Sequence, residues 1–198
     1  MVTHTVRALC IAACTSLVLF ALPHQSRAES MPQSVPRIRV QSRHLHTQLT
    51  HVIERSPTLR EIVGQIEQSN VIAYVMCERF ASVVLEGRTI WGSSSPDARY
   101  VRVQIDCMLP EQRLVAVLGH ELQHVAEIAA APDVVDSRSF VRLFLSIGYS
   151  CGRAASLERY ETSQAIEAGE RVRREYLFGW PLGGPGVVAN TRGGVPLE

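Results

Sequence analysis

Short apolar runs and alternating patterns in the first half of the chain are typical of β-strands. Val71 to Met76 is a compact apolar run that ends at Cys77, and it predicts a buried strand. A second strand is expected from Arg88 to Trp91, after a turn at Glu86-Gly87. Tyr100 to Ile105 alternates Tyr and Val with Arg and Gln, which indicates a strand with one solvated face.

Helical spacing of apolar residues occurs once in the first half and dominates the second half. Ser56 followed by Pro57 forms a typical N-cap and first helical residue, and predicts a helix that includes Leu59 to Gln68. Three later helices are expected: Glu111 to Ala131, Ser137 to Ile147, and about Ala154 to Tyr176. Residues 56–178 therefore predict one α+β domain with a small mixed or antiparallel sheet.

The first 28 residues have the layout of a secretory signal peptide. Met1 to Arg7 is positively charged, Ala8 to Leu22 is apolar, and Ser26-Arg27-Ala28 provides small residues around a cleavage site. A transmembrane anchor is the alternative, but such a run rises only about 23 Å as a helix, short of a ~30 Å hydrocarbon core. We therefore expect export to the periplasm or medium of a bacterium, with no stable membrane span after cleavage.

Two segments flank the predicted domain. Residues 29–55 begin with a stretch rich in Pro, Ser and Gln, which is typical of a linker, and continue into a weak helical pattern from His44 to Val52. Residues 179–198 are rich in Gly and Pro, and we expect them to form an extended tail.

Charge and cysteine content narrow the range of functions. The formal net charge is +1, and no basic cluster indicates a nucleic-acid partner. Three cysteines follow the signal peptide: Cys77, Cys107 and Cys151. In an oxidising compartment the simplest arrangement is one disulfide, and we pair Cys77 with Cys107 because both end strand-like runs. The chain has no CxxC spacing, which argues against a cysteine-based zinc site.

The predicted central helix contains the candidate functional residues, in the HExxH motif His120-Glu121-Leu122-Gln123-His124. Histidines four positions apart lie on one face of a helix, so that both imidazoles can bind one metal ion. Glu121 lies to the side of that face, where its carboxylate can accept a proton from a water molecule at the metal. Polar groups in so apolar a helix are costly to bury without a partner.

A catalytic zinc ion normally has three protein ligands, so a third must come from elsewhere. The metzincin pattern requires a histidine six residues after His124, where this chain has Ala130. Glu127 lies a full turn beyond the metal, and we expect it to orient an imidazole or an arginine. Glu161 is the stronger candidate because it falls on the apolar face of the predicted last helix, where a buried carboxylate needs compensation. An ion pair between Glu161 and Arg153 or another arginine is the alternative.

The HExxH motif at His120 to His124, followed by a helical Glu161, resembles the gluzincins, the zinc peptidases whose third ligand is a glutamate on a later helix. The resemblance covers about Val71 to Tyr176. It implies a zincin-like fold, in which a sheet packs on an active-site helix and a ligand-bearing helix. It also implies one zinc ion per chain, a peptide or protein substrate, and Glu121 as the general base.

Two details of the resemblance concern the substrate and the histidines. In gluzincins an edge strand aligns the peptide by β-augmentation, a part that Arg88 to Trp91 or Tyr100 to Ile105 can play here. The chain departs from the thermolysin-type pattern at Ala165, where that pattern has an aspartate, so support for a histidine must come from elsewhere, with Glu127 as the candidate.

Other interpretations stay open at this point. Tyr160, Tyr149 and Arg153 are near enough to Glu161 in sequence to be considered for oxyanion stabilisation. The same ligands also suit a non-catalytic, zinc-stabilised binding or envelope-associated module, although such a module has no need for Glu121. In a purely structural protein the two histidines would only fill a core.

Overall fold

The structure of the chain is a computed structural model that describes residues 36–81, 85–154 and 157–179. The predicted signal peptide, the start of the linker and the tail from residue 180 lie outside the described residues. Within the described part, none of the helices combines the length and apolar character needed to cross a membrane.

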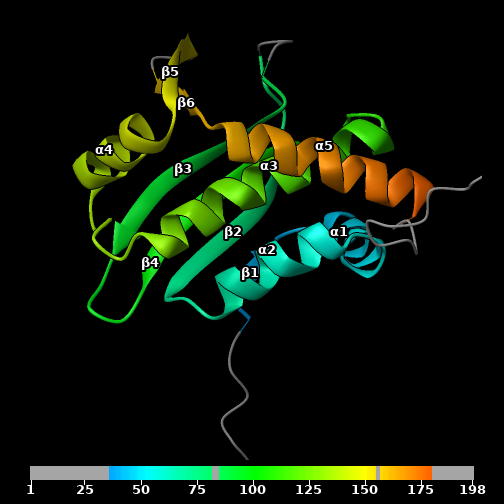
Figure 1. Ribbon diagram of the computed structural model, residues 1–198, viewed down its shortest axis with the longest axis horizontal. Helices are drawn as coiled ribbons and strands as arrows, with labels where there is room; N and C mark the ends of the chain where they lie inside the picture. Colours follow the sequence, from blue (N-terminus) through cyan, green and yellow to red (C-terminus); the bar gives the residue numbers. More distant parts are fainter. Residues whose placement is uncertain (1–35, 82–84, 155–156, 180–198) are drawn as a thin grey trace, which may run out of the picture. The chain divides into compact units, whose positions relative to one another are not determined.

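The main sheet has four strands in the order β1-β2-β4-β3 (Figure 1). The bounds are β1 (Ile38–Val40), β2 (Val71–Glu78), β3 (Gly87–Ser94) and β4 (Arg99–Asp106). Strands β1, β2 and β4 are parallel, whereas β3 runs antiparallel to β4 and forms one edge of the sheet. The fold is therefore α+β with a mixed sheet, as predicted.

Five helices and a small hairpin complete the described part of the fold. The helices are α1 (Arg43–Arg55), α2 (Pro57–Glu67), α3 (Glu111–Ala130), α4 (Ser137–Ile147) and α5 (Ser163–Phe178). The antiparallel hairpin consists of β5 (Tyr149–Ala154) and β6 (Leu157–Glu161). Helix α3 lies across one face of the sheet, and α5 packs along α3 (Figure 1).

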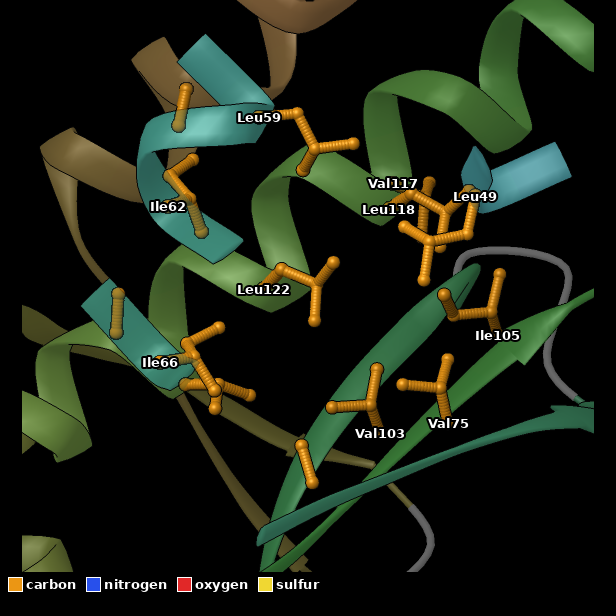
Figure 2. Close-up of a cluster of buried hydrophobic side chains, with 14 of the residues drawn as sticks. Leu49, Leu59, Ile62, Ile66, Val75, Val103, Ile105, Val117, Leu118 and Leu122 are labelled. Atoms are coloured by element: carbon orange, nitrogen blue, oxygen red, sulfur yellow. The ribbon is translucent and has the colours of Figure 1, made fainter. Parts of the chain in front are cut away.

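The hydrophobic core lies between the sheet and helices α1, α2 and α3. Alternate strand residues such as Val75, Val103 and Ile105 point toward Leu118 and Leu122 of α3 (Figure 2). All five of these side chains are completely buried. Because the side chains of a strand alternate between faces, this register fixes which face of each strand packs on α3.

Two glycines allow α3 and α5 to approach each other closely. A Cβ atom at Gly119 would lie 2.8 Å from Cγ2 of Val172, and one at Gly169 would lie 2.8 Å from the carbonyl oxygen of Ala116. Larger residues at these positions would push the helices apart. The contact also limits the position of Glu161 relative to α3, because β6 ends at Glu161 and α5 begins two residues later.

Several predicted elements are confirmed. Helix α2 begins at Pro57, and the hydroxyl of Ser56 accepts a hydrogen bond from the Leu59 amide, as expected for an N-cap. The predicted strand and helix segments at residues 71–76, 100–105, 111–131 and 137–147 correspond to β2, β4, α3 and α4. The structure also joins Cys77 to Cys107 by a disulfide with a Cα–Cα distance of 5.4 Å, and Cys151 is free and exposed.

Two predicted boundaries are wrong. The domain does not begin at Ser56, because β1 pairs with β2 and Leu45 and Val52 of α1 are completely buried in the core. The last helix does not begin near Ala154, because the chain first forms the β5–β6 hairpin and α5 starts only at Ser163. Glu161 is therefore the last residue of a strand and not part of a helix.

The C-terminal end of α3 is fixed by a buried arginine. The guanidinium of Arg99 donates hydrogen bonds to the carbonyl oxygens of Ile128 at 2.8 Å and Ala131 at 2.6 Å, and to Oδ1 of Asn70 at 2.8 Å. A cation at this position adds a second donor to carbonyl groups at the end of the helix and complements the negative end of the helix dipole. The contact anchors α3 to the start of β4.

Helix α5 is tied to α2 by the buried carboxylate of Glu175. Its Oε2 accepts from the Ser56 hydroxyl at 2.5 Å and the Thr58 amide at 3.1 Å, and its Oε1 accepts from the Thr58 hydroxyl at 2.7 Å. The carboxylate therefore satisfies donors at the N-terminus of α2, where negative charge is favourable.

We predict that Glu175→Ala lowers the free energy of unfolding by about 2–4 kcal/mol, because it leaves buried donors without a partner. Glu167→Ala, an exposed position on the same helix, is the control and is expected to change it by less than about 0.5 kcal/mol. Urea unfolding of the two variants measures the difference. Equal effects would show that the Glu175 contacts do not stabilise the fold.

Candidate metal centre

Helix α3 presents both motif histidines to a cleft. The imidazole rings of His120 and His124 lie one turn apart with centroids 4.9 Å from each other. His124 is buried, while His120 is partly exposed. The predicted convergence of the two rings on one side of the helix is therefore present in the structure.

Glu161 reaches the two histidines from the end of β6. Its Oε1 lies 3.3 Å from Nε2 of His120 and 3.5 Å from Nε2 of His124. Two ligand atoms placed 2.0–2.1 Å from a tetrahedral metal ion are about 3.3 Å apart, so these separations suit a shared ion. His120, His124 and Glu161 thus form a group that can hold a metal ion, with ligand atoms within 4.8 Å of one another.

Glu127 supports His124 from the side away from the cleft. Its Oε2 lies 2.8 Å from Nδ1 of His124, and its Oε1 accepts a hydrogen bond of 2.7 Å from the hydroxyl of Thr162. A carboxylate on the far nitrogen of a ligating histidine is common in metal sites, where it fixes the orientation of the ring. Of the two roles expected for Glu127, the structure shows contact with an imidazole.

The carboxylate of Glu121 lies beside the metal-ligand group, between α3 and β3. Its Oε2 accepts a 2.8 Å hydrogen bond from the hydroxyl of Thr89, which also donates to the Glu121 carbonyl oxygen at 3.2 Å. Gly87 leaves room for this side chain, because a Cβ atom there would lie 2.8 Å from Oε1 of Glu121 and 2.6 Å from Cγ1 of Val117. The edge strand thus positions Glu121.

The titration of these groups reflects their mutual contacts. Burial raises the pKa of Glu121 above its ordinary value. Burial lowers the pKa of His124, but hydrogen bonds to Glu127 and Glu161 outweigh this and raise it from 6.5 to about 10. Burial also raises the pKa of Glu161, whereas contacts with His120 and His124 lower it from 4.5 to about 2. A bound cation would replace the proton that otherwise balances this negative charge.

The cleft over these groups has a volume of about 640 Å³ and is bordered by β3, α3, α4, β6 and α5. Part of the lining is aromatic: the ring centroids of Trp91 and Phe140 are 6.3 Å apart, and those of Phe144 and His124 are 5.3 Å apart. The lining also contains the ion pair of Arg113 with Glu86. The cleft is large enough for several residues of an extended chain or for a small molecule.

The three residues considered for oxyanion stabilisation differ in position. Tyr160 lines the cleft, and its hydroxyl donates to Oε2 of Glu158 at 3.1 Å. Tyr149 is 50% exposed. The side chain of Arg153 lies outside the described part of the structure.

Three residues of the site were not predicted: Thr89, Gly87 and Thr162. Thr89 and Gly87 act through pairing between distant segments, which the local sequence pattern does not reveal. Thr162 is next to Glu161 and could have been suspected as an N-cap, because threonine is a favoured residue at that position. A last helix that begins near Ala154, as the sequence predicts, places Thr162 inside the helix and not at its N-cap.

Comparison with protein-family models, with curated proteins and with solved structures finds no match to this chain.

We predict that the purified protein binds one divalent cation per chain and that Glu161→Ala lowers its affinity on the order of 100-fold or more, because it removes one of three ligands. Glu158→Ala is the matched control, since Glu158 lies on the same strand and is exposed. Titration with Co²⁺, followed by absorption and calorimetry, measures both. Equal affinities of the two variants would remove Glu161 from the site.

Proposed function

We propose that the chain is an exported zinc-dependent metallopeptidase with a gluzincin-like arrangement on a zincin-like fold. In this proposal His120, His124 and Glu161 bind one zinc ion, Glu121 is the general base, and the substrate is a peptide or protein. The observation that carries the proposal is the convergence of two imidazole nitrogens and one carboxylate oxygen beside a separate, buried glutamate.

The chemistry of the donors supports zinc. Two histidines and one glutamate are a ligand set of catalytic zinc sites, which leave a further position for water or substrate. The same donor types also bind Fe(II) in oxygenases, so elemental analysis of the purified chain is a necessary part of the test. The buried contact between Glu127 and His124 adds the support that metal-binding imidazoles usually have.

Zinc, when bound here, would polarise a substrate carbonyl and make water a better nucleophile at neutral pH. Glu121 is suited to accept the proton of that water, because it is buried beside the ligands and held by Thr89 without belonging to the ligand group. The protonated carboxyl can then return the proton to the departing amine. His124 cannot serve as that base, because in this proposal its Nε2 binds the zinc ion and its Nδ1 contacts Glu127.

The edge of the main sheet formed by β3 supports a peptide substrate. Of the two strands considered for alignment, β4 lies between β2 and β3, whereas β3 is the edge strand and borders the cleft from Gly87 to Trp91. An extended peptide can pair with the unpaired backbone groups of such an edge. This position would carry the peptide past the metal ligands and Glu121.

The disulfide between Cys77 and Cys107 supports export. Disulfides persist in the periplasm and outside the cell, and they are rare in the reducing cytoplasm. The bond agrees with the signal peptide expected from residues 1–28, which the structure does not describe.

We predict that Glu121→Gln retains zinc but lowers the rate of peptide hydrolysis by about 10²–10⁴-fold, because the amide cannot accept a proton. Cleavage of a panel of denatured proteins, with and without a chelator, gives the activity, and elemental analysis gives the metal content. Zinc retained in a wild-type protein that cleaves nothing would identify a non-catalytic binding module. Full activity in the Gln variant would remove Glu121 as the base.

A second prediction concerns the orientation of Glu121. Thr89→Val is expected to lower kcat by roughly tenfold while leaving zinc content unchanged, because the general base loses the hydrogen bond that holds its carboxylate. Thr89→Ser keeps the hydroxyl and should restore most of the rate. Steady-state kinetics on the three proteins tests this, and an unchanged kcat in the valine variant would contradict it.

A further inference from the structure

Thr162 occupies the junction between β6 and α5 and is almost completely buried, with 1% of its surface exposed. Its amide donates a 2.9 Å hydrogen bond to Oε1 of Glu161. Its hydroxyl donates to Oε1 of Glu127 at 2.7 Å and accepts from the amide of Ala165 at 3.1 Å. Thr162 therefore contacts the candidate ligand Glu161, the Glu127 carboxylate that contacts the candidate ligand His124, and the first turn of α5.

The direction of these hydrogen bonds is determined by the donors available. A backbone amide can only donate, so the Thr162 hydroxyl must accept from Ala165 and has its single proton free for Glu127. Glu127 thus accepts at Oε1 and can accept the Nδ1 proton of His124 at Oε2. With the Nδ1 proton held by Glu127, Nε2 is the nitrogen of His124 that faces Glu161, and its lone pair can bind a metal ion that takes the place of the Nε2 proton.

The backbone around Thr162 has little space to move. A Cβ atom at Gly148 would lie 2.1 Å from the carbonyl oxygen of Glu161 and 3.0 Å from Cγ2 of Thr162. The residue before β5 therefore packs directly on the end of β6. This contact packs the Glu161–Thr162 segment against the C-terminal end of α4, while the hydrogen bond from Thr162 to Glu127 joins it to α3.

We propose that Thr162 is a positioning residue of the metal site, which fixes the tautomer and orientation of His124 through Glu127 and the carboxylate of Glu161 through its own amide. The inference rests on the metal site of the proposed function, but it does not depend on the identity of the substrate. A residue that only caps α5 would stabilise the fold without affecting metal binding.

Another part of the fold offers a matched control. Ser56 has the same two roles at α2: its hydroxyl accepts from the Leu59 amide and donates to the buried carboxylate of Glu175. Ser56 and Glu175 are not among the residues that line the cleft. Ser56→Ala therefore removes a cap and a donor to a buried glutamate without touching the metal site.

The test compares Zn²⁺ and Co²⁺ affinities and the visible spectrum of the Co²⁺ form in Thr162→Val, Thr162→Ser and Ser56→Ala. We expect Thr162→Val to weaken metal binding by about tenfold and to change the Co²⁺ spectrum, because a ligating imidazole loses its support. Thr162→Ser should bind within about twofold of the wild type, since the hydroxyl is kept. Ser56→Ala should lower thermal stability but leave affinity and spectrum unchanged.

A double variant tests whether Thr162 acts through Glu127. Thr162→Val combined with Glu127→Gln should bind metal no more weakly than Glu127→Gln alone, because the two residues act in series. If the valine variant does not fold, Thr162→Gly removes the hydroxyl at a smaller cost to helix capping and takes its place. Wild-type affinity in the Thr162 variants, or an equal loss in Ser56→Ala, would overturn the inference.

The outcomes also separate this inference from the proposed function. A wild-type protein that binds metal and cleaves no peptide, with weakened metal binding in Thr162→Val, would contradict the peptidase proposal and support the positioning role. An active wild type whose metal affinity is unaffected by Thr162→Val would support the peptidase proposal and contradict the positioning role. A wild type that binds no metal would overturn both.

Discussion

The need to balance buried charge at the centre of α3 constrains the rest of the site. The carboxylates of Glu121, Glu127 and Glu161 lie around two imidazoles, and Glu121, Glu127 and His124 are buried. Unpaired charges are costly to bury, so each carboxylate requires a hydrogen-bond donor or a cation. Glu127 has His124 and a hydroxyl, and Glu121 has the hydroxyl of Thr89. Glu161 has the amide of Thr162, and its Oε1 also lies 3.3 and 3.5 Å from Nε2 of His120 and of His124, a spacing that suits a shared metal cation.

The fold meets this constraint by bringing three separate segments to one helix. Arg99 holds the end of α3 against β4, and close packing at Gly119 and Gly169 keeps α5 beside it. The β5–β6 hairpin then delivers Glu161 from one side, and the edge strand β3 reaches Glu121 from the other. The core under α3 therefore contributes to the site by holding β3 and the β5–β6 hairpin in fixed positions relative to α3.

The sequence could predict what depends on spacing along one element. The two histidines on one face of α3 follow from helical periodicity, and the start of α2 follows from its N-cap. The sequence places Glu161 on the apolar stripe of a helix, whereas it is the last residue of a strand. Residues 149–161 have no clear alternation, so their pattern does not predict the hairpin. Thr89 and Gly87 could not be predicted, because their roles depend on β3 lying against α3.

The central claim is that one metal ion is held jointly by two imidazoles of α3 and the carboxylate at the end of β6. Crystals of the metal-loaded protein, measured on both sides of the zinc absorption edge, test it most directly. We expect a single anomalous peak within about 2.0–2.2 Å of Nε2 of His120, Nε2 of His124 and a carboxylate oxygen of Glu161. A peak at another place, or crystals with stoichiometric zinc whose Glu161 side chain points away from it, would contradict this account.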